Sequence, residues 1–138
     1  MLCHSELDSE SLLIYDKFME ELHLRNYAYI GDAVWELYIR NKTIHMTDNS
    51  KKLHEITTAK VKMGFQADLL NVFEPILTEE EHEIARRGRN LSIPVGRRQN
   101  QGEYRQATAF ETLIGWWYLN YPERLSEMYE KAEEYIKF

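Results

Sequence analysis

The scarcity of breakers and of strand-like patterning most constrains the fold of this chain. Only three prolines and six glycines interrupt its 138 residues. The alternation of apolar and polar residues that marks half-buried strands is nearly absent. We therefore predict an all-α fold. The length suits one domain with a core of its own, so we take residues 1–138 as a single domain.

Caps and breakers divide the chain into expected helices. Thr78, followed by three glutamates, is a strong N-terminal cap because the acids complement the helix dipole. Gly88 is expected to supply a left-handed turn where that helix ends, and residues 91–103 have the composition of a loop. The other expected helices are residues 9–21 capped by Asp8 or Ser9, residues 27–40, 53–73 and 104–120, and the stretch from Pro122 onward.

Charge is unevenly distributed along the sequence. The net charge of −6 would argue against a nucleic-acid partner if the acids were spread evenly. Instead, the stretch from Arg86 to Arg105 contains six arginines and a single acid, Glu103. Such a stretch is either a solvated loop or a surface that binds phosphates, and taken alone it favours the solvated loop.

The sequence also indicates a compartment. No apolar run approaches the length of a membrane span, and the first residues lack the basic and apolar regions of a secretory signal. Cys3 is the only cysteine, which fits a reducing cytoplasm. The five histidines show no spacing typical of a zinc site. We expect a cytoplasmic protein without a membrane partner.

Two apolar helices contain the same pair of unfavourable residues. "YAYIGDAVWELYIR", residues 27–40, holds Gly31 and Asp32, and "YRQATAFETLIGWWYLN", residues 104–120, holds Glu111 and Gly115. A glycine inside a helix costs about 1 kcal/mol relative to alanine, and a buried carboxylate costs more unless it is paired, protonated or metal-bound. Small residues let two helix backbones approach closely, so a crossing at the glycines would bring Asp32 and Glu111 together.

Two convergent carboxylates suit Mg²⁺, which takes oxygen ligands and phosphate oxygens and can activate water for phosphodiester hydrolysis. Two structural interpretations compete with this one. Asp32 alternatively caps a helix that starts at Ala33, and Glu111 alternatively pairs with an arginine or lies at a solvated edge. The residues alone support the metal site and the structural interpretations about equally.

At these same residues the sequence resembles the ribonuclease III family. "YIGDAVWELYIR" is similar to the signature helix of that family, and "ATAFETLIGWWYL" resembles its second catalytic helix with the Phe-Glu-x-Leu-Ile-Gly core. "LTEEEHEIARRGRN", then a loop, then "YRQATAFE" resembles the Mini-III branch. The resemblance covers most of the chain, from about residue 24 to 119.

The resemblance implies a ribonuclease III endonuclease domain, a helical bundle that acts as a homodimer on double-stranded RNA. Mg²⁺ would be the cofactor, with Mn²⁺ as a possible substitute. Asp32 and Glu111 match the family's central catalytic and metal-binding acids. Glu36 matches the second acid of the signature, which we expect to orient the helix or a ligand through a hydrogen bond. The expected substrate is precursor RNA, notably large-subunit (23S) ribosomal RNA, cut to leave 5′-phosphate ends.

The sequence departs from full-length ribonuclease III in two ways. Ala28 and Thr108 stand where the larger enzymes carry two further acids, and the Mini-III branch also lacks these acids. The larger enzymes continue into a double-stranded-RNA-binding domain, whereas this sequence ends at Phe138, so we expect the catalytic domain itself to hold the duplex through its phosphates and 2′-hydroxyls. The RNA-binding candidates are the basic residues around the loop, with two lysines as weaker ones: Arg86, Arg87, Arg89, Arg97, Arg98, Lys60 and Lys62.

Adjacent aromatic residues suggest a partner surface. Trp116 and Trp117 cannot both face one core from a single helix face, so we expect one of them at a surface, with a dimer interface as a natural use for it. The apolar face of residues 27–40 is expected to contribute to that interface.

Two other functional classes compete with the enzyme. A ribonuclease III-fold protein that binds RNA or ribosomes without cleaving would account for the missing acids. A helical protein–protein module would leave the clustered arginines and the matched glycine–acid helices unexplained. Cleavage of duplex RNA by the wild type, lost in Asp32→Asn and Glu111→Gln, would favour the enzyme.

Overall fold

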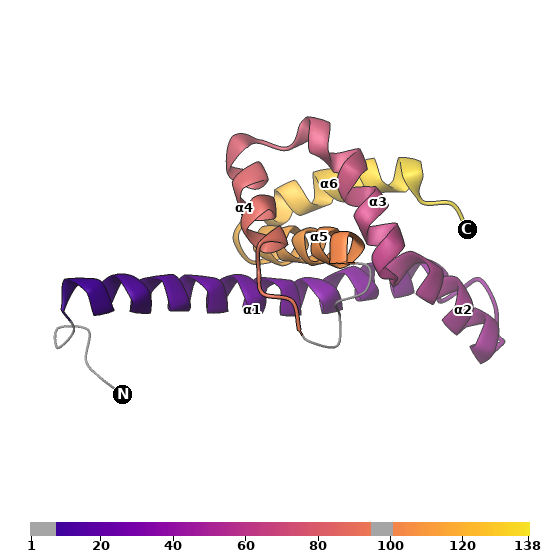
Figure 1. Ribbon diagram of the computed structural model, residues 1–138. Helices are drawn as coiled ribbons and strands as arrows, with labels where there is room; N and C mark the ends of the chain where they lie inside the picture. The colour runs from indigo at the N-terminus through magenta and orange to yellow at the C-terminus, as the bar shows by residue number, and fades with distance from the viewer. Residues whose placement is uncertain (1–7, 95–100) are drawn as a thin grey trace.

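The fold is helical throughout the part of the chain that the structure, a computed structural model, describes: residues 8–94 and 101–138. The all-α prediction is confirmed there. Cys3, Arg97 and Arg98 lie outside the described residues. The elements are α1 (Ser9–Thr43), α2 (Ser50–Val61), α3 (Met63–Phe73), the 3-10 turn η2 (Glu74–Ile76), α4 (Glu79–Arg89), α5 (Gln101–Asn120) and α6 (Pro122–Tyr135), seen in Figure 1.

Helix α1 joins two segments that the sequence predicted as separate helices. It begins at Ser9, where the Asp8 side chain accepts a hydrogen bond from the Ser11 N–H, so the predicted cap is confirmed. The expected break after residue 21 is wrong, because residues 22–26 contain neither glycine nor proline and the helix continues to Thr43. The result is the long rod along one side of the molecule in Figure 1.

The helix predicted for residues 53–73 is interrupted. Lys62 has an extended backbone, with φ −70° and ψ 157°, and it separates α2 from α3. The break leaves the Lys60 carbonyl without its intrahelical donor, and the indole Nε1–H of Trp35 donates to it at 2.8 Å. A buried side chain of α1 therefore stabilises the bend between α2 and α3.

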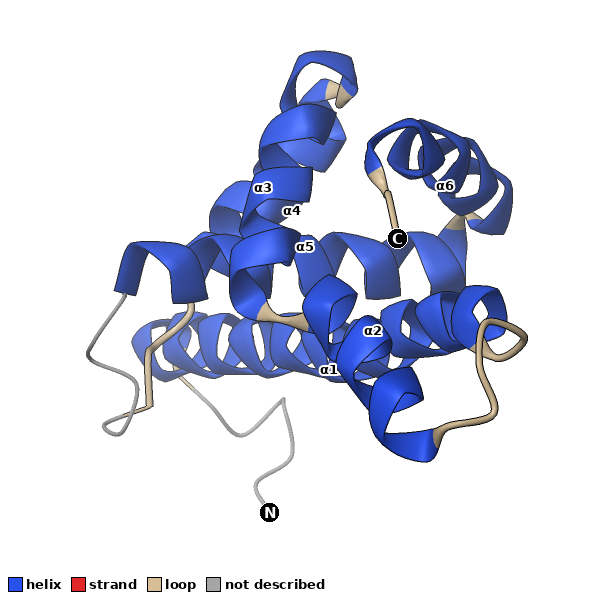
Figure 2. Cartoon of the chain, turned by 90° about the vertical axis from the view of Figure 1, so that its right-hand side faces the viewer, coloured by secondary structure: helices blue, strands red, loops and turns tan. Residues whose placement is uncertain are grey.

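Helix α5 is the central helix of the domain. It packs against α1, α3, α4 and α6, and Figure 2 shows α1 on one side of it with α3, α4 and α6 on the other. Because α5 is surrounded, both Trp116 and Trp117 are buried in one core. The prediction that one of them faces a surface is wrong, since adjacent residues on a surrounded helix pack against different neighbours.

Helix α4 begins as predicted and ends differently. The Thr78 hydroxyl accepts from the Glu81 N–H at 3.1 Å, and the Glu81 carboxylate accepts from the Thr78 N–H at 2.8 Å, which confirms the cap. The left-handed turn at Gly88 is wrong: Gly88 is helical, and a Cβ there would lie 2.9 Å from the Thr112 hydroxyl. Gly88 lets α4 approach α5 closely.

A buried carboxylate connects α4 to the helices beside it. Glu81 is 4% exposed and accepts hydrogen bonds from the Trp117 indole at 2.8 Å and from Arg124 Nε at 2.9 Å. Arg124 also donates to the Ile76 carbonyl. Burial acts to raise the pKa of Glu81, but hydrogen bonds from Arg124, Thr78 and Trp117 outweigh it and hold that pKa below its usual value.

Within the described residues, no helix combines the length and the apolar character needed to cross a lipid bilayer.

Candidate active site

Helices α1 and α5 cross at the two glycines that the sequence singled out. A Cβ at Gly31 would overlap the carbonyl oxygen of Glu111 and lie 2.8 Å from the Gly115 nitrogen. A Cβ at Gly115 would overlap the Tyr27 carbonyl oxygen and lie 2.9 Å from Ile30 Cγ2. Each helix thus has a glycine where the other helix's backbone passes, and the predicted close crossing is confirmed.

The crossing brings Asp32 and Glu111 together across 79 positions of sequence. Asp32 lies in the middle of α1, so the alternative that it caps a helix start is wrong. Burial, the charge of Asp32 and a hydrogen bond with its carboxylate raise the pKa of Glu111 to about 8. Glu111 therefore faces an acid, and the alternative of an arginine partner is also wrong.

The two carboxylates line a cavity between α1, α3 and α5. Its other lining groups are mostly apolar, and Thr108, which stands where larger relatives have an acid, donates its hydroxyl to the Tyr104 carbonyl at 2.9 Å. One further polar side chain, Gln66 of α3, is 2% exposed. The complete lining is Asp32, Val61, Met63, Gln66, Tyr104, Ala107, Thr108 and Glu111.

The donor set in this cavity suits a hard divalent cation. Within the described residues no group of three His, Cys, Asp or Glu side chains converges. The polar side chains of the lining are two carboxylates, the Gln66 amide and the hydroxyls of Thr108 and Tyr104, which all carry oxygen. Oxygen ligands of this kind favour Mg²⁺ or Mn²⁺ over zinc. The repulsion between Asp32 and Glu111, which contributes to the raised pKa of Glu111 after burial, is the interaction that a cation would relieve.

Glu36 lies one turn beyond Asp32 but outside the cavity lining. Its carboxylate forms an ion pair with Arg40, 3.4 Å from Nη2, and both side chains are exposed. In this arrangement Glu36 contacts its own helix, and its role in orienting a ligand stays a prediction.

The described basic residues differ in their surroundings. Arg86 pairs with Glu83 on the surface of α4, while Arg89 Nη1 contacts Glu74 at 3.2 Å and Gln106 at 3.4 Å. Arg87 lines a shallow hollow beside Trp116.

Lys60 and Lys62 differ as well. Lys60 Nζ lies 4.8 Å from the centre of the Phe65 ring. Lys62 is exposed between Val61 and Met63, both of which line the carboxylate cavity. Lys62 therefore adjoins two residues of the cavity lining in the sequence.

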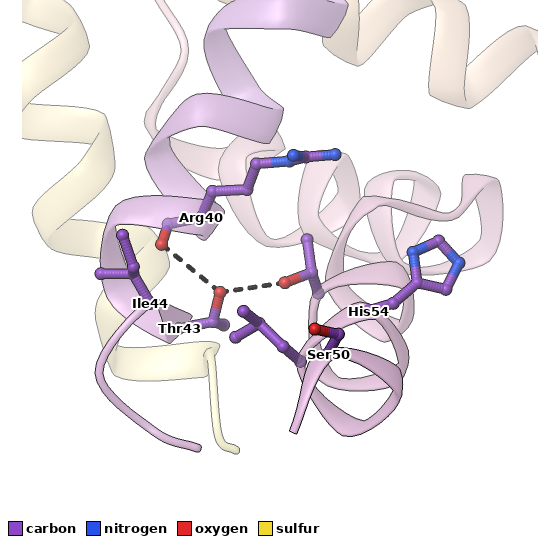
Figure 3. Close-up of a pocket in the computed structure, with 7 residues that line it drawn as sticks. Arg40, Thr43, Ile44, Ser50 and His54 are labelled. Atoms are coloured by element: carbon purple, nitrogen blue, oxygen red, sulfur yellow. Dashed lines mark hydrogen bonds between the residues drawn. The ribbon is translucent and has the colours of Figure 1, made fainter. Parts of the chain in front are cut away.

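A second cavity lies at the end of α1 (Figure 3). Arg40, Thr43, Ser50 and His54 surround it, and the Thr43 and Thr57 hydroxyls share a hydrogen bond of 2.9 Å at its wall. No acidic side chain lines this cavity, so it offers no carboxylate to a cation. The chemistry of the fold therefore points to the cavity between α1, α3 and α5.

Comparison with known proteins identifies the class. A ribonuclease III domain model matches residues 25–122, a span that contains both glycines and both acids of the crossing. The chain therefore belongs to the ribonuclease III family, as the sequence predicted, and it is an endoribonuclease.

The relatives define the branch of that family. Mini-ribonuclease 3 of Gloeobacter violaceus is 39% identical over 117 residues, covering 85% of this chain and 87% of that protein. Mini-ribonuclease 3 of Kosmotoga olearia is 37% identical, covering 91% and 88%. A crystal structure of a Fusobacterium nucleatum protein superimposes with a TM-score of 0.71 at 32% identity, covering 81% of this chain and 90% of that one. The predicted Mini-III branch is confirmed.

Sequence reasoning missed Gln66. Its segment, "MGFQADLLNVF", has the same pattern as the two catalytic-helix candidates, with a polar residue among apolar ones. This pattern could have identified Gln66 from the sequence. Gln66 lies on the same buried face as Leu69 and Leu70, one turn later, and a polar side chain on a buried face is unfavourable unless it has a partner.

Proposed function

We propose that this endoribonuclease cuts double-stranded RNA with a divalent cation, Mg²⁺ or Mn²⁺, held by Asp32 and Glu111. The observation that carries the proposal is the approach of the two carboxylates at the Gly31–Gly115 crossing, where Glu111 is partly buried and faces the charge of Asp32. The bound cation would supply a Lewis acid that polarises the scissile phosphate and lowers the pKa of water.

The chain's own residues supply position and protonation. Asp32 and Glu111 present acceptor oxygens from two helices whose backbones touch, so their separation is fixed by the fold. Glu111 carries a proton near neutral pH in the cation-free site, because burial and Asp32 raise its pKa to about 8. That proton has to leave before both carboxylates can act as ligands.

The duplex would lie against the mouth of this cavity. Duplex RNA is bound through phosphates and 2′-hydroxyls, and Lys62 is exposed next to two residues of the cavity lining. Lys62 is therefore our first candidate for a phosphate contact. Arg86, Arg87 and Arg89 are further candidates, of which Arg86 is paired with Glu83 and Arg89 with Glu74 and Gln106.

We also propose a homodimer, on the strength of an apolar surface on α1. Tyr29 is 82% exposed and Leu37 is 60% exposed. With exposed Ala33 between them, they form a row at i, i+4 and i+8 on one side of the helix. This row adjoins the one that carries Asp32, Glu36 and Arg40. A second copy packed on the apolar row would place its own acids near the same duplex.

The cellular substrate is proposed from the resemblance to the Mini-III branch alone. We propose a structured precursor of large-subunit (23S) ribosomal RNA, processed in the cytoplasm to 5′-phosphate ends. Sequencing of ribosomal RNA ends from cells with and without the gene tests this part, and identical ends in both would contradict it.

Cleavage of a blunt RNA duplex tests the site. Asp32→Asn and Glu111→Gln should each lower the rate at least about 100-fold in Mg²⁺, because each removes one of two anionic ligands. Asp48→Asn, the same change at an exposed position outside the cavity, is the matched control and should cut normally.

The outcomes separate the candidate functions. Full activity in both site variants would refute the assignment of the acids. Duplex binding without cleavage by the wild type, in both Mg²⁺ and Mn²⁺, would favour the non-cleaving RNA-binding protein. Light scattering tests the dimer: Leu37→Asp should give monomers, whereas Val72→Asp, on exposed α3 surface, should not.

A further inference from the structure

The Gln66 side chain is buried without a hydrogen-bond partner. It is 2% exposed, and its carboxamide makes no hydrogen bond to any residue in the described ranges, 8–94 and 101–138. Among the described residues, the fully enclosed side-chain polar atom without a partner is the Tyr129 hydroxyl, so the Gln66 amide is open to the cavity that it lines. Leucine or methionine would fill the same space, so packing alone does not explain a polar group facing this cavity.

The location of this amide suggests what it serves. Gln66 comes from α3, whereas Asp32 and Glu111 come from α1 and α5, and the three side chains line one cavity. Helix α3 packs against α5 (Figure 1). Of the other polar side chains of the lining, Thr108 is already bonded within its own helix, and Tyr104 offers a phenol hydroxyl. Gln66 is the one that brings a carbonyl-type oxygen to the two acids.

We propose that the Gln66 carboxamide oxygen is a third oxygen donor of the cation site, facing the cation directly or through one bound water. The inference rests on the proposed function, because it takes the Asp32–Glu111 pair as the cation site. Carbonyl oxygens, like carboxylates and water, suit Mg²⁺ and Mn²⁺.

Gln66 differs from a third acid because its side chain is uncharged. An amide oxygen adds a ligand or a water acceptor without adding charge. In this chain Ala28 and Thr108 replace two acids found in larger relatives, and Gln66 would supply part of the lost coordination from a different helix.

Mn²⁺ binding to the RNA-free protein, followed by the electron paramagnetic resonance signal of free Mn²⁺, tests the proposal without reference to activity. Gln66→Met keeps the volume and removes the amide, and it should weaken Mn²⁺ binding about tenfold, the lower range for groups that support a metal ligand. Its melting temperature without metal should stay close to that of the wild type, because methionine keeps the packing of α3. Gln106→Met, at a partly buried glutamine outside the cavity, is the matched control and should bind Mn²⁺ normally.

Gln66→Glu distinguishes the oxygen from the amide N–H. Glutamate keeps an oxygen and loses the N–H donors, so it should bind Mn²⁺ at least as well as the wild type. If Gln66→Glu binds as weakly as Gln66→Met, the amide donates to Glu111 and the proposal is overturned. Normal Mn²⁺ binding by Gln66→Met overturns the proposal as well. If Gln66→Met loses only affinity for duplex RNA, measured without divalent cations, the amide contacts RNA and the proposal is also overturned.

Asp32→Asn in the same titration separates this inference from the proposed function. If Asp32→Asn binds Mn²⁺ as tightly as the wild type, the proposed cation site is refuted, and the proposed role of Gln66 is refuted with it. If Asp32→Asn loses Mn²⁺ while Gln66→Met keeps it, the proposed site stands and only the role of Gln66 is refuted.

Discussion

Gly31→Ala is the sharpest test of the fold because it adds one carbon at the closest approach of α1 and α5. The new Cβ would overlap the Glu111 carbonyl oxygen and lie 2.8 Å from the Gly115 nitrogen, where ordinary contact begins at 3.4 Å. Both obstacles are backbone atoms, which cannot rotate away as a side chain can. The two helices must therefore separate, and the carboxylates they carry must separate with them.

The magnitude follows from two opposing effects. Replacing glycine by alanine inside a helix normally stabilises by about 1 kcal/mol, whereas overpacking costs about 1–3 kcal/mol, and more against backbone. Because separation also opens gaps along α1 and α5, we expect a net loss of about 2–3 kcal/mol in the free energy of unfolding. For a domain of this size that lowers the melting temperature by roughly 10 °C.

Thermal unfolding with a control in α5, the other helix of the crossing, checks this expectation. A Cβ at Gly102 meets no atom within 4 Å, so Gly102→Ala should leave the melting temperature unchanged or raise it. Gly31→Ala should also weaken Mn²⁺ binding at temperatures where it remains folded. If Gly31→Ala melts at or above the wild type, the glycine is not there for close approach and the reasoning is refuted.

Three further expectations concern buried polar groups. Burial and Asp32 raise the pKa of Glu111 to about 8 from its usual 4.5, so between these pH values the folded state holds a proton that the unfolded chain has lost. The free energy of unfolding of the cation-free protein, measured by urea titration, should therefore fall as pH rises from about 4.5 to 8. Glu111→Gln should make this pH dependence weaker. Arg124→Ala leaves the Glu81 carboxylate buried without its main partner and should reduce unfolding free energy by about 3 kcal/mol, part of which Glu81→Gln should restore in the double variant. Tyr129→Phe removes a buried hydroxyl without a partner in the described structure and should melt no lower than the wild type, whereas a clear fall would reveal a hidden partner.

The sequence predicted the crossing because its signal is local. Each glycine lies within one turn of its acid, and each helix is otherwise apolar. The two glycines and two acids, each unfavourable in such a helix, could therefore be interpreted together as one helix crossing. The cap at Thr78 was predictable for the same reason, since the whole capping box lies within four consecutive residues.

The errors came where distant contacts decide the local structure. The break at Lys62 is not marked by a proline or glycine at that position. The Lys60 carbonyl beside it accepts a hydrogen bond from Trp35, 25 positions away. Gly88 looked like a helix end, but its small size serves a contact with Ala109 and Thr112 of α5. Both tryptophans of α5 are buried because four other helices surround it, which no pattern within α5 itself indicates.

A site built on a glycine crossing differs physically from one built on loops. Asp32 follows directly after Gly31, and the carbonyl of Glu111 itself touches that glycine, so the tightest backbone contact between α1 and α5 sets the spacing of the two acids. Loops would relax apart under the repulsion of two carboxylates, whereas these helices are held by the core on both sides. Without a cation, burial first and the charge of Asp32 second keep Glu111 protonated. A divalent cation that displaced this proton would remove the repulsion without moving a helix, so the preformed spacing would favour cation binding. The glycines are therefore as much a part of the proposed cation site as the acids, and a substitution at either one should reduce cation affinity even though neither contributes a ligand.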